Sequence, residues 1–291
     1  MKRLCAQFTY GRDEAMILTR RDSHLKPKLH DLSAVLTSFA YRPEYLPELQ
    51  GMLPTVRKHH ADWKIVTGEG PCEQATFQVQ FEDVREFWTL PVDLHLDGSE
   101  NDFRKINHMK GWWMHEVWKR WGGTADAGMH RIMWLDADAR LNGPLDFEID
   151  AESELLAGAW WTSNKDEYPE LDNFETITGG LLLFQGRQGG SAERLLQRWS
   201  SASLTEIRQL RAPTVRWLDA DQERLTELVR EHLTVDTELQ IVKLDYHRYS
   251  GDVRNDGTRV EGALVDQWMM GRKMKFPSSR GRDWPPPEEQ R

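Results

Sequence analysis

The segment that most restricts how this chain can fold is a short apolar run that ends in two carboxylates. Residues 131–140 read RIMWLDADAR, so Asp136 and Asp138 come directly after the apolar stretch from Ile132 to Leu135. Consecutive large apolar residues predict a strand buried on both faces, as in the centre of an α/β sheet. Ligands of such sheets bind outside the carboxyl ends of the strands. We therefore expect Asp136 and Asp138 to face a crevice.

Strand and helix patterns alternate along the rest of the chain, which predicts an α/β fold. Strands are expected at residues 32–40, 63–68, 92–96, 131–135, 155–161, 178–184, 239–244 and 263–265. Helices are expected at residues 46–56, 103–121, 192–199 and 225–229. The first strand, helix and strand imply a parallel pair joined by a right-handed crossover. We expect a Rossmann-like, mainly parallel central sheet flanked by helices.

The chain is expected to form one domain with two flanking segments. Residues 1–30 read as an N-terminal extension, residues 31–276 as the domain, and residues 277–291 as a polar, proline-rich tail that is disordered. The polar segment 163–173 is expected to form a loop over the crevice.

The composition is that of a soluble globular protein, with 39% hydrophobic and 29% charged residues. No apolar run is long enough to span a bilayer, and the N-terminus does not resemble a signal peptide. The two cysteines, Cys5 and Cys72, are too few for a disulfide scaffold or a zinc site. We therefore expect a cytoplasmic protein, in a bacterium or a phage-infected cell.

The acid pair is suited to a divalent metal. Oxygen ligands are preferred by Mg²⁺ and Mn²⁺, which also bind the phosphate oxygens of substrates. Asp136 and Asp138 would then hold an ion against a nucleotide diphosphate. The alternative is that both acids are solvated loop residues before the turn at 142–144. The very apolar run before them favours the metal site.

These residues also carry a family resemblance. The WLDAD sequence at 134–138 resembles the DxD motif of GT-A glycosyltransferases, of the nucleotide-diphospho-sugar transferase type. The resemblance covers residues 32–273 and includes His108 to Lys110, Thr178 to Gly180, and Asp221 with Gln222, in that order. It implies a GT-A fold and metal-dependent transfer of a hexosyl or pentosyl group from a nucleotide sugar to an acceptor hydroxyl. A UDP-sugar and retention of configuration are favoured.

The resemblance also implies roles for individual residues. Asp138 would bind the metal directly, and Asp136 the metal or the ribose. A late-strand histidine often adds a third ligand in such enzymes; here Asp266 takes that place, unless the ligand is absent or is His247. The donor would be contacted by the remaining candidates, which are Thr37, Ser38, Phe39, Lys110, Gly179, Gly180 and Gln222.

A second copy of WLDAD at 217–221 shows that the pentapeptide alone means little. This copy runs into a predicted helix, where Asp219 fits an N-cap with Gln222 three residues later. Asp221 is open to two interpretations. An acid is favoured in the first turn of a helix by the dipole, and the resemblance places this residue near the sugar or the acceptor, where it would be the catalytic base of an inverting enzyme.

Other functions are less well supported by the sequence. A P-loop and a GxGxxG motif are both missing, and the glycine- and lysine-rich opening of sugar nucleotidyltransferases does not follow Leu36. A non-catalytic nucleotide-sugar-binding module remains an alternative. The acceptor is open between a glycan, a protein, a small molecule and a hydroxymethylated base in DNA. With a net charge of −9, binding to DNA would need a local basic groove. One candidate groove consists of Arg254, Arg259, Arg272, Lys273 and Lys275.

Overall fold

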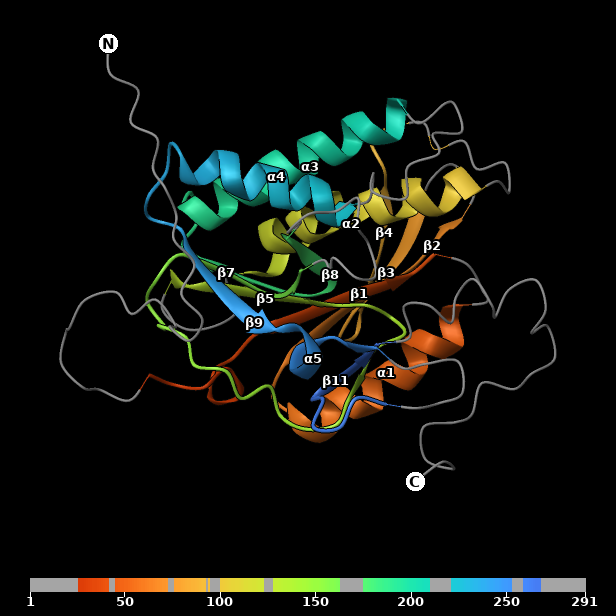
Figure 1. The fold of residues 1–291 in the computed structure, drawn as a ribbon. Helices are drawn as coiled ribbons and strands as arrows, with labels where there is room; N and C mark the ends of the chain where they lie inside the picture. The colour runs from red at the N-terminus through yellow and green to blue at the C-terminus, as the bar shows by residue number, and fades with distance from the viewer. Residues whose placement is uncertain are drawn as a thin grey trace, which may run out of the picture.

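The computed structural model describes residues 26–41, 45–72, 76–92, 94, 100–122, 128–162, 175–209, 221–252 and 259–267. They form an 8-stranded sheet with helices on both faces, and a separate 3-stranded sheet (Figure 1). The predicted α/β fold with a sheet between helices is therefore confirmed. Among the described residues, the helices are too short or too polar to cross a membrane.

The large sheet has parallel pairs at its centre and at one edge. Its order is β4 (Val84–Thr89), β3 (Thr76–Phe81), β2 (Lys64–Cys72), β1 (Val35–Ala40), β5 (His130–Leu135), β8 (Glu175–Gly186), β7 (Leu155–Thr162) and β9 (Gln240–Asp245). The pairs β1–β2, β1–β5 and β7–β9 are parallel. However, β8 is antiparallel to both β5 and β7, and β2, β3 and β4 form an antiparallel meander. The sheet is thus mixed, whereas a mainly parallel sheet was expected. The hydrophobic pattern of a strand does not encode its direction, so the antiparallel pairs could not be predicted from it.

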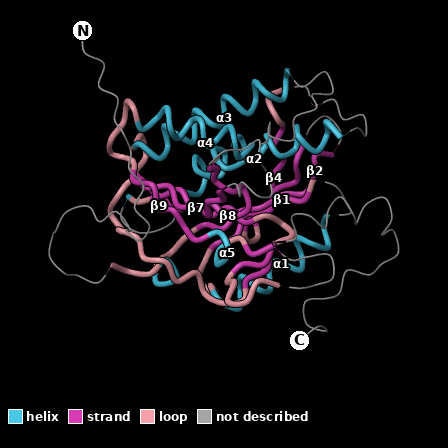
Figure 2. The backbone as a smooth tube through the Cα atoms, in the orientation of Figure 1, coloured by secondary structure: helices cyan, strands magenta, loops and turns pink. Residues whose placement is uncertain are grey.

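Helices and the small sheet cover opposite faces of the large sheet (Figures 1 and 2). One face carries α2 (Glu100–Trp121), α3 (Ser191–Gln209) and α4 (Asp221–Leu233). The other carries α1 (Leu46–His59), α5 (Tyr246–Tyr249) and the small sheet of β10 (Gly251–Asp252), β11 (Val265–Gln267) and β6 (Arg140–Leu141). Each face has its own buried apolar cluster, so the large sheet is the middle layer of three.

The core explains why β5 is apolar from Ile132 to Leu135. Ile132, Met133 and Leu135 have no exposed surface and Trp134 is 2% exposed, which confirms the buried strand predicted before the acid pair. Its alternate side chains enter the two clusters: Ile132 and Trp134 the α2–α4 side, and Met133 and Leu135 the α1 side. The α2–α4 cluster holds many of the tryptophans, so core packing accounts for much of this composition.

The other predicted helices and strands can be compared with those in the structure. The four predicted helices occur as α1, α2, α3 and α4, and the strand predicted at 239–244 occurs as β9. The strand predicted at 263–265 shares only Val265 with β11. The β3–β4 hairpin was not predicted, although Phe77, Val79 and Phe81 alternate with polar residues as in a half-buried strand. Val92 and Leu94, within a predicted strand, are not in strand conformation.

The last residues of the extension expected at 1–30 pack against the domain. Leu29 is fully buried, and its backbone N–H donates to the carbonyl of Phe147 at 3.0 Å. Several other predictions fall outside the described residues, namely the extension at 1–25, the loop at 163–173, the cap at Asp219, the tail at 277–291, and the basic residues Arg254, Arg272, Lys273 and Lys275.

Candidate functional site

Asp136 lies where the chain leaves β5 and is held by its own surroundings. Its backbone N–H donates to the carbonyl of Gly180 at 2.9 Å, and its carbonyl accepts from Ala139 at 2.9 Å, which closes a tight turn. The indole N–H of Trp134 donates to Oδ1 of Asp136 at 2.8 Å. The acid predicted to face the crevice therefore has a fixed orientation at the carboxyl end of a buried strand.

Lys110 connects Asp136 to a second carboxylate. Its Nζ lies 3.3 Å from Oδ1 of Asp136 and 3.0 Å from Oδ2 of Asp221, and it donates to the carbonyl of Gly179 at 2.8 Å. An ammonium has three donors, so these three acceptors use its capacity. Nζ also lies 5.1 Å from the ring centroid of Trp134, within cation–π range. Lys110 thus joins α2, β5, β8 and α4 at one point.

The electrostatics of this cluster keep Lys110 charged. Burial alone lowers the pKa of Lys110, but the charges of Asp136 and Asp221 and their hydrogen bonds outweigh burial, so the pKa lies above its ordinary value. With both acids ionised, the three side chains hold two negative charges and one positive charge.

Asp221 is positioned by α4, which is fastened along β8. Oε1 of Gln222 accepts from the backbone N–H of Gly179 at 3.3 Å, and Oγ1 of Thr226 accepts from that of Ile177 at 3.0 Å. One turn further, Arg230 donates to the carbonyl of Glu175 at 2.9 Å. Side chains spaced four residues apart on the helix thus bind alternate residues of the strand. Gln222, expected at the donor, is bonded here to the protein backbone.

The two glycines of β8 make room for side chains of this chain. A Cβ on Gly179 would lie 2.8 Å from Nζ of Lys110 and 3.1 Å from Oδ2 of Asp221. A Cβ on Gly180 would lie 1.6 Å from Nε2 of Gln267. The family resemblance implied that both glycines let the backbone approach the sugar closely. In the structure, the close approach is made by Lys110 and Gln267, and no sequence signal pointed to Gln267.

Asp138 and Asp266 have different surroundings from Asp136. Both are 1% exposed. Arg140 is buried beside Asp138; burial lowers the pKa of Arg140, and the charges of Asp138 and Glu48 act in the opposite direction. Asp266 lies opposite Arg140 in the β11–β6 pair, and its Oδ2 is 3.2 Å from NH1 of Arg259. These two acids are therefore buried, and each has an arginine nearby.

The donor set fits a divalent metal only in part. Across the described residues, no three or more His, Cys, Asp or Glu side chains are placed to hold one ion, so Asp136, Asp138 and Asp266 are not assembled as a three-carboxylate group. His247 is exposed on α5, with its ring 5.5 Å from that of Tyr246. Mg²⁺ is commonly bound by one or two carboxylates together with substrate phosphates. That Asp136 and Asp138 bind an ion in this way stays a prediction.

The residues expected under the nucleotide belong to the core. Oγ1 of Thr37 accepts from the indole N–H of Trp113 at 2.7 Å, and Ser38 is fully buried. The ring of Phe39 lies 5.4 Å from that of Trp113 and 5.2 Å from that of Trp134. Thr37 and Phe39 therefore have packing roles and Ser38 is buried with them, and a nucleotide contact by the three residues stays a prediction.

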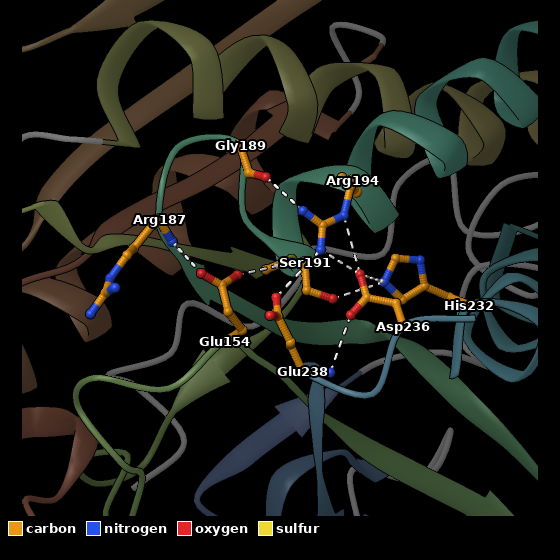
Figure 3. A network of polar contacts seen from close by, with 9 residues as sticks. Glu154, Arg187, Gly189, Ser191, Arg194, His232, Asp236 and Glu238 are labelled. Atoms are coloured by element: carbon orange, nitrogen blue, oxygen red, sulfur yellow. Dashed lines mark hydrogen bonds and ion pairs between the residues drawn. The ribbon is translucent and has the colours of Figure 1, made fainter. Parts of the chain in front are cut away.

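A second polar network, at the other end of α4, contains Ser191, His232 and Asp236 (Figure 3). Oγ of Ser191 lies 2.9 Å and Oδ2 of Asp236 lies 3.2 Å from the same ring nitrogen, Nε2 of His232. A serine hydrolase triad needs serine and acid on different ring nitrogens. Ser191 is also fully buried. We therefore interpret this network as a structural link between α3 and α4.

A surface cavity of about 880 Å³ lies beside this network and not at Lys110. Two of its arginines are already paired, Arg194 with Asp236 at 2.6 Å and Arg198 with Glu231 at 2.8 Å. By the helix rise of 1.5 Å per residue, His232 lies roughly 16 Å along α4 from Asp221. The cavity is too open and too far away to belong to the Lys110 cluster.

The Lys110 cluster is thus the part of the described structure in which the separate sequence motifs meet. No protein-family model matches this chain, and no curated protein matches its sequence. Its function must therefore be inferred from the residues and their geometry.

Proposed function

We propose that this protein is a metal-dependent glycosyltransferase of the GT-A type. It would transfer a sugar from a nucleotide diphosphate sugar, with a UDP-sugar favoured, to an acceptor hydroxyl. One observation carries the proposal: Lys110 joins Asp136, at the carboxyl end of β5, to Asp221 and to the backbone of Gly179. Motifs from four parts of the chain, singled out as parts of one site, therefore lie together. The mixed α/β sheet is compatible with the proposed fold.

In the proposed reaction, the bond between the anomeric carbon and the β-phosphate oxygen breaks, and the nucleoside diphosphate leaves with the electron pair. The acceptor oxygen bonds to the anomeric carbon and loses its proton. The favoured course is retention, in which the departing diphosphate takes that proton. If the configuration inverts, the carboxylate of Asp221 is the candidate base. When bound by Asp136 and Asp138, Mg²⁺ or Mn²⁺ would supply positive charge to the diphosphate.

Lys110 would serve this reaction by preorganisation. Because its three donors are used within the cluster, it holds Asp136 and Asp221 in place before the donor arrives. A buried ammonium also offsets negative charge near the leaving group without reorganising. Its pKa, which the two acids raise, keeps the charge at neutral pH.

A donor panel tests the proposal. Stabilisation by UDP, GDP, ADP or TDP would be measured by thermal shift, with and without Mn²⁺, followed by release of nucleotide from the matching sugar nucleotide. We expect a shift that needs both metal and one nucleotide, and its loss in Asp138→Asn. Glu152→Gln, an exposed acid in the loop before β7, is the control. Equal shifts in Asp138→Asn would refute the site, and binding without nucleotide release would indicate a non-catalytic binding protein.

A further inference from the structure

Gln267 is a fully buried polar residue at the end of β11 that the proposed chemistry has not used. Its Oε1 accepts from the hydroxyl of Ser250 at 2.7 Å, and Ser250 is itself fully buried. This contact sets the orientation of the carboxamide and turns Nε2 toward Gly180. There Nε2 occupies the place of the missing Cβ, 1.6 Å from where that atom would be.

The nitrogen of this carboxamide has no acceptor among the described residues. A buried N–H group without an acceptor is destabilising, and most buried polar groups in native proteins are paired. The protein could have avoided the defect with an apolar side chain of the same length. A donor that is held in one orientation and left without an acceptor is instead typical of a group that a ligand completes.

Gln267 is connected to the acid pair through two neighbouring elements. The carbonyl of Gly180, the residue against which Nε2 packs, accepts from the backbone N–H of Asp136. In addition, β11 pairs with β6, which begins immediately after the acid pair, with Asp266 opposite Arg140. The carboxamide is therefore anchored on both sides to the segment that carries Asp136 and Asp138.

We propose that Gln267 is a donor-binding residue whose Nε2 donates a hydrogen bond to an oxygen of the nucleotide's diphosphate. The inference rests on the proposed function. Diphosphate oxygens are acceptors only, so the nearby carboxylates of Asp136, Asp138 and Asp266 cannot hydrogen-bond to them. A carboxamide N–H can. The sugar hydroxyls, which also donate, are suited to the carboxylates themselves.

The test is calorimetric titration of UDP in the presence of Mn²⁺, on the full chain. Gln267→Glu keeps the length of the side chain and the acceptor for Ser250, but it replaces the donor with a carboxylate. Gln267→Met is a neutral variant of similar length without the donor. We expect each variant to weaken UDP binding by about 10-fold or more, the usual effect of losing a hydrogen bond to a charged group. Gln240→Glu, at an exposed position of β9, should bind as the wild type does.

A titration with uridine separates a phosphate contact from a general structural effect. Because uridine has no phosphate, its affinity should change less than about 2-fold in the same variants. An equal loss for UDP and uridine, or unchanged UDP binding by Gln267→Met, would overturn the inference and leave the proposed function in place. A wild-type protein that binds none of UDP, GDP, ADP and TDP with Mn²⁺ would instead overturn the proposed function.

Ser250→Ala keeps the inference testable if both Gln267 variants fail to fold. This variant leaves Nε2 present but removes the hydroxyl that orients the carboxamide. We expect it to weaken UDP binding by several-fold, with uridine affected less. UDP binding equal to the wild type would overturn the inference.

Discussion

The ammonium of Lys110 lies 3.0 Å from the carboxylate of Asp221, and both side chains are 6% exposed. The two residues come from the middle of α2 and the first residue of α4. Their contact closes the cluster at the end of β5, since Asp136 binds the same ammonium. The catalytic roles proposed for these residues depend on this buried charge balance, which mutation can test directly.

Replacing Lys110 should strongly destabilise the fold. Lys110→Met leaves the buried carboxylate of Asp221 and the partly exposed carboxylate of Asp136 without their cation. Breaking a buried pair typically costs about 3–5 kcal/mol. Urea denaturation should show this loss, and Lys110→Met combined with Asp221→Asn should recover part of it because one charge is removed. Lys119→Met, on the exposed side of α2 where it pairs with Glu116, is the control and should change stability by about 0.5 kcal/mol or less.

Adding a methyl group at Gly179 should act through Lys110. The new Cβ in Gly179→Ala would lie 2.8 Å from Nζ, so the ammonium must move away from its acceptors. We expect a loss of about 1–3 kcal/mol and weaker nucleotide binding. In a double-mutant cycle with Lys110→Met, the second substitution should add much less than it does alone. Fully additive effects would show that the glycine has another role.

Thr37 should matter to the core through its hydroxyl. Thr37→Val keeps the shape of the side chain but leaves the buried indole N–H of Trp113 without its acceptor, which should cost about 1–3 kcal/mol. Thr37→Ser keeps the acceptor and should lose less. Thermal denaturation of the two variants measures the difference. A serine variant as unstable as the valine variant would contradict the role of the hydroxyl as acceptor for Trp113.

The stability of the protein should fall in mild acid partly because of His60. Burial, with smaller effects from the charges of His59 and His30, lowers the pKa of His60 from 6.5 to about 4. Its Nε2 accepts from the backbone N–H of Leu145 at 3.1 Å, which requires the unprotonated ring nitrogen. Between pH 6.5 and 4 the unfolded chain therefore binds more protons than the folded chain, so stability is present above this range and is lost as the pH falls through it.

Urea denaturation across this pH range provides the measurement. His60→Gln keeps an acceptor for Leu145 and should flatten the pH dependence, by roughly 3 kcal/mol in total. Part of the dependence should remain because burial also lowers the pKa of His115, His130 and His232. A slope identical to that of the wild type would show that His60 does not carry the effect.

Some of this site could be predicted because it depends on local patterns. The apolar run before Asp136 identifies β5, since a strand in the middle layer must be buried on both faces. Helical spacing similarly places Lys110 on α2 and Asp221 at the start of α4. The direction of β8 and the β3–β4 hairpin were not predicted, because strand pairing joins segments whose own periodicity does not name their partners.

The sequence by itself therefore determined which segments are buried and which chemical groups stand at their ends. Hydrophobic periodicity indicates, residue by residue, which face of each strand or helix is buried. Only the tertiary structure decided that Lys110 pairs with both Asp136 and Asp221, that Gly179 makes room for this contact, and that Gln267 packs on Gly180. These relationships arise from packing between distant segments, in which each buried charge or donor must find its partner in space and not along the chain.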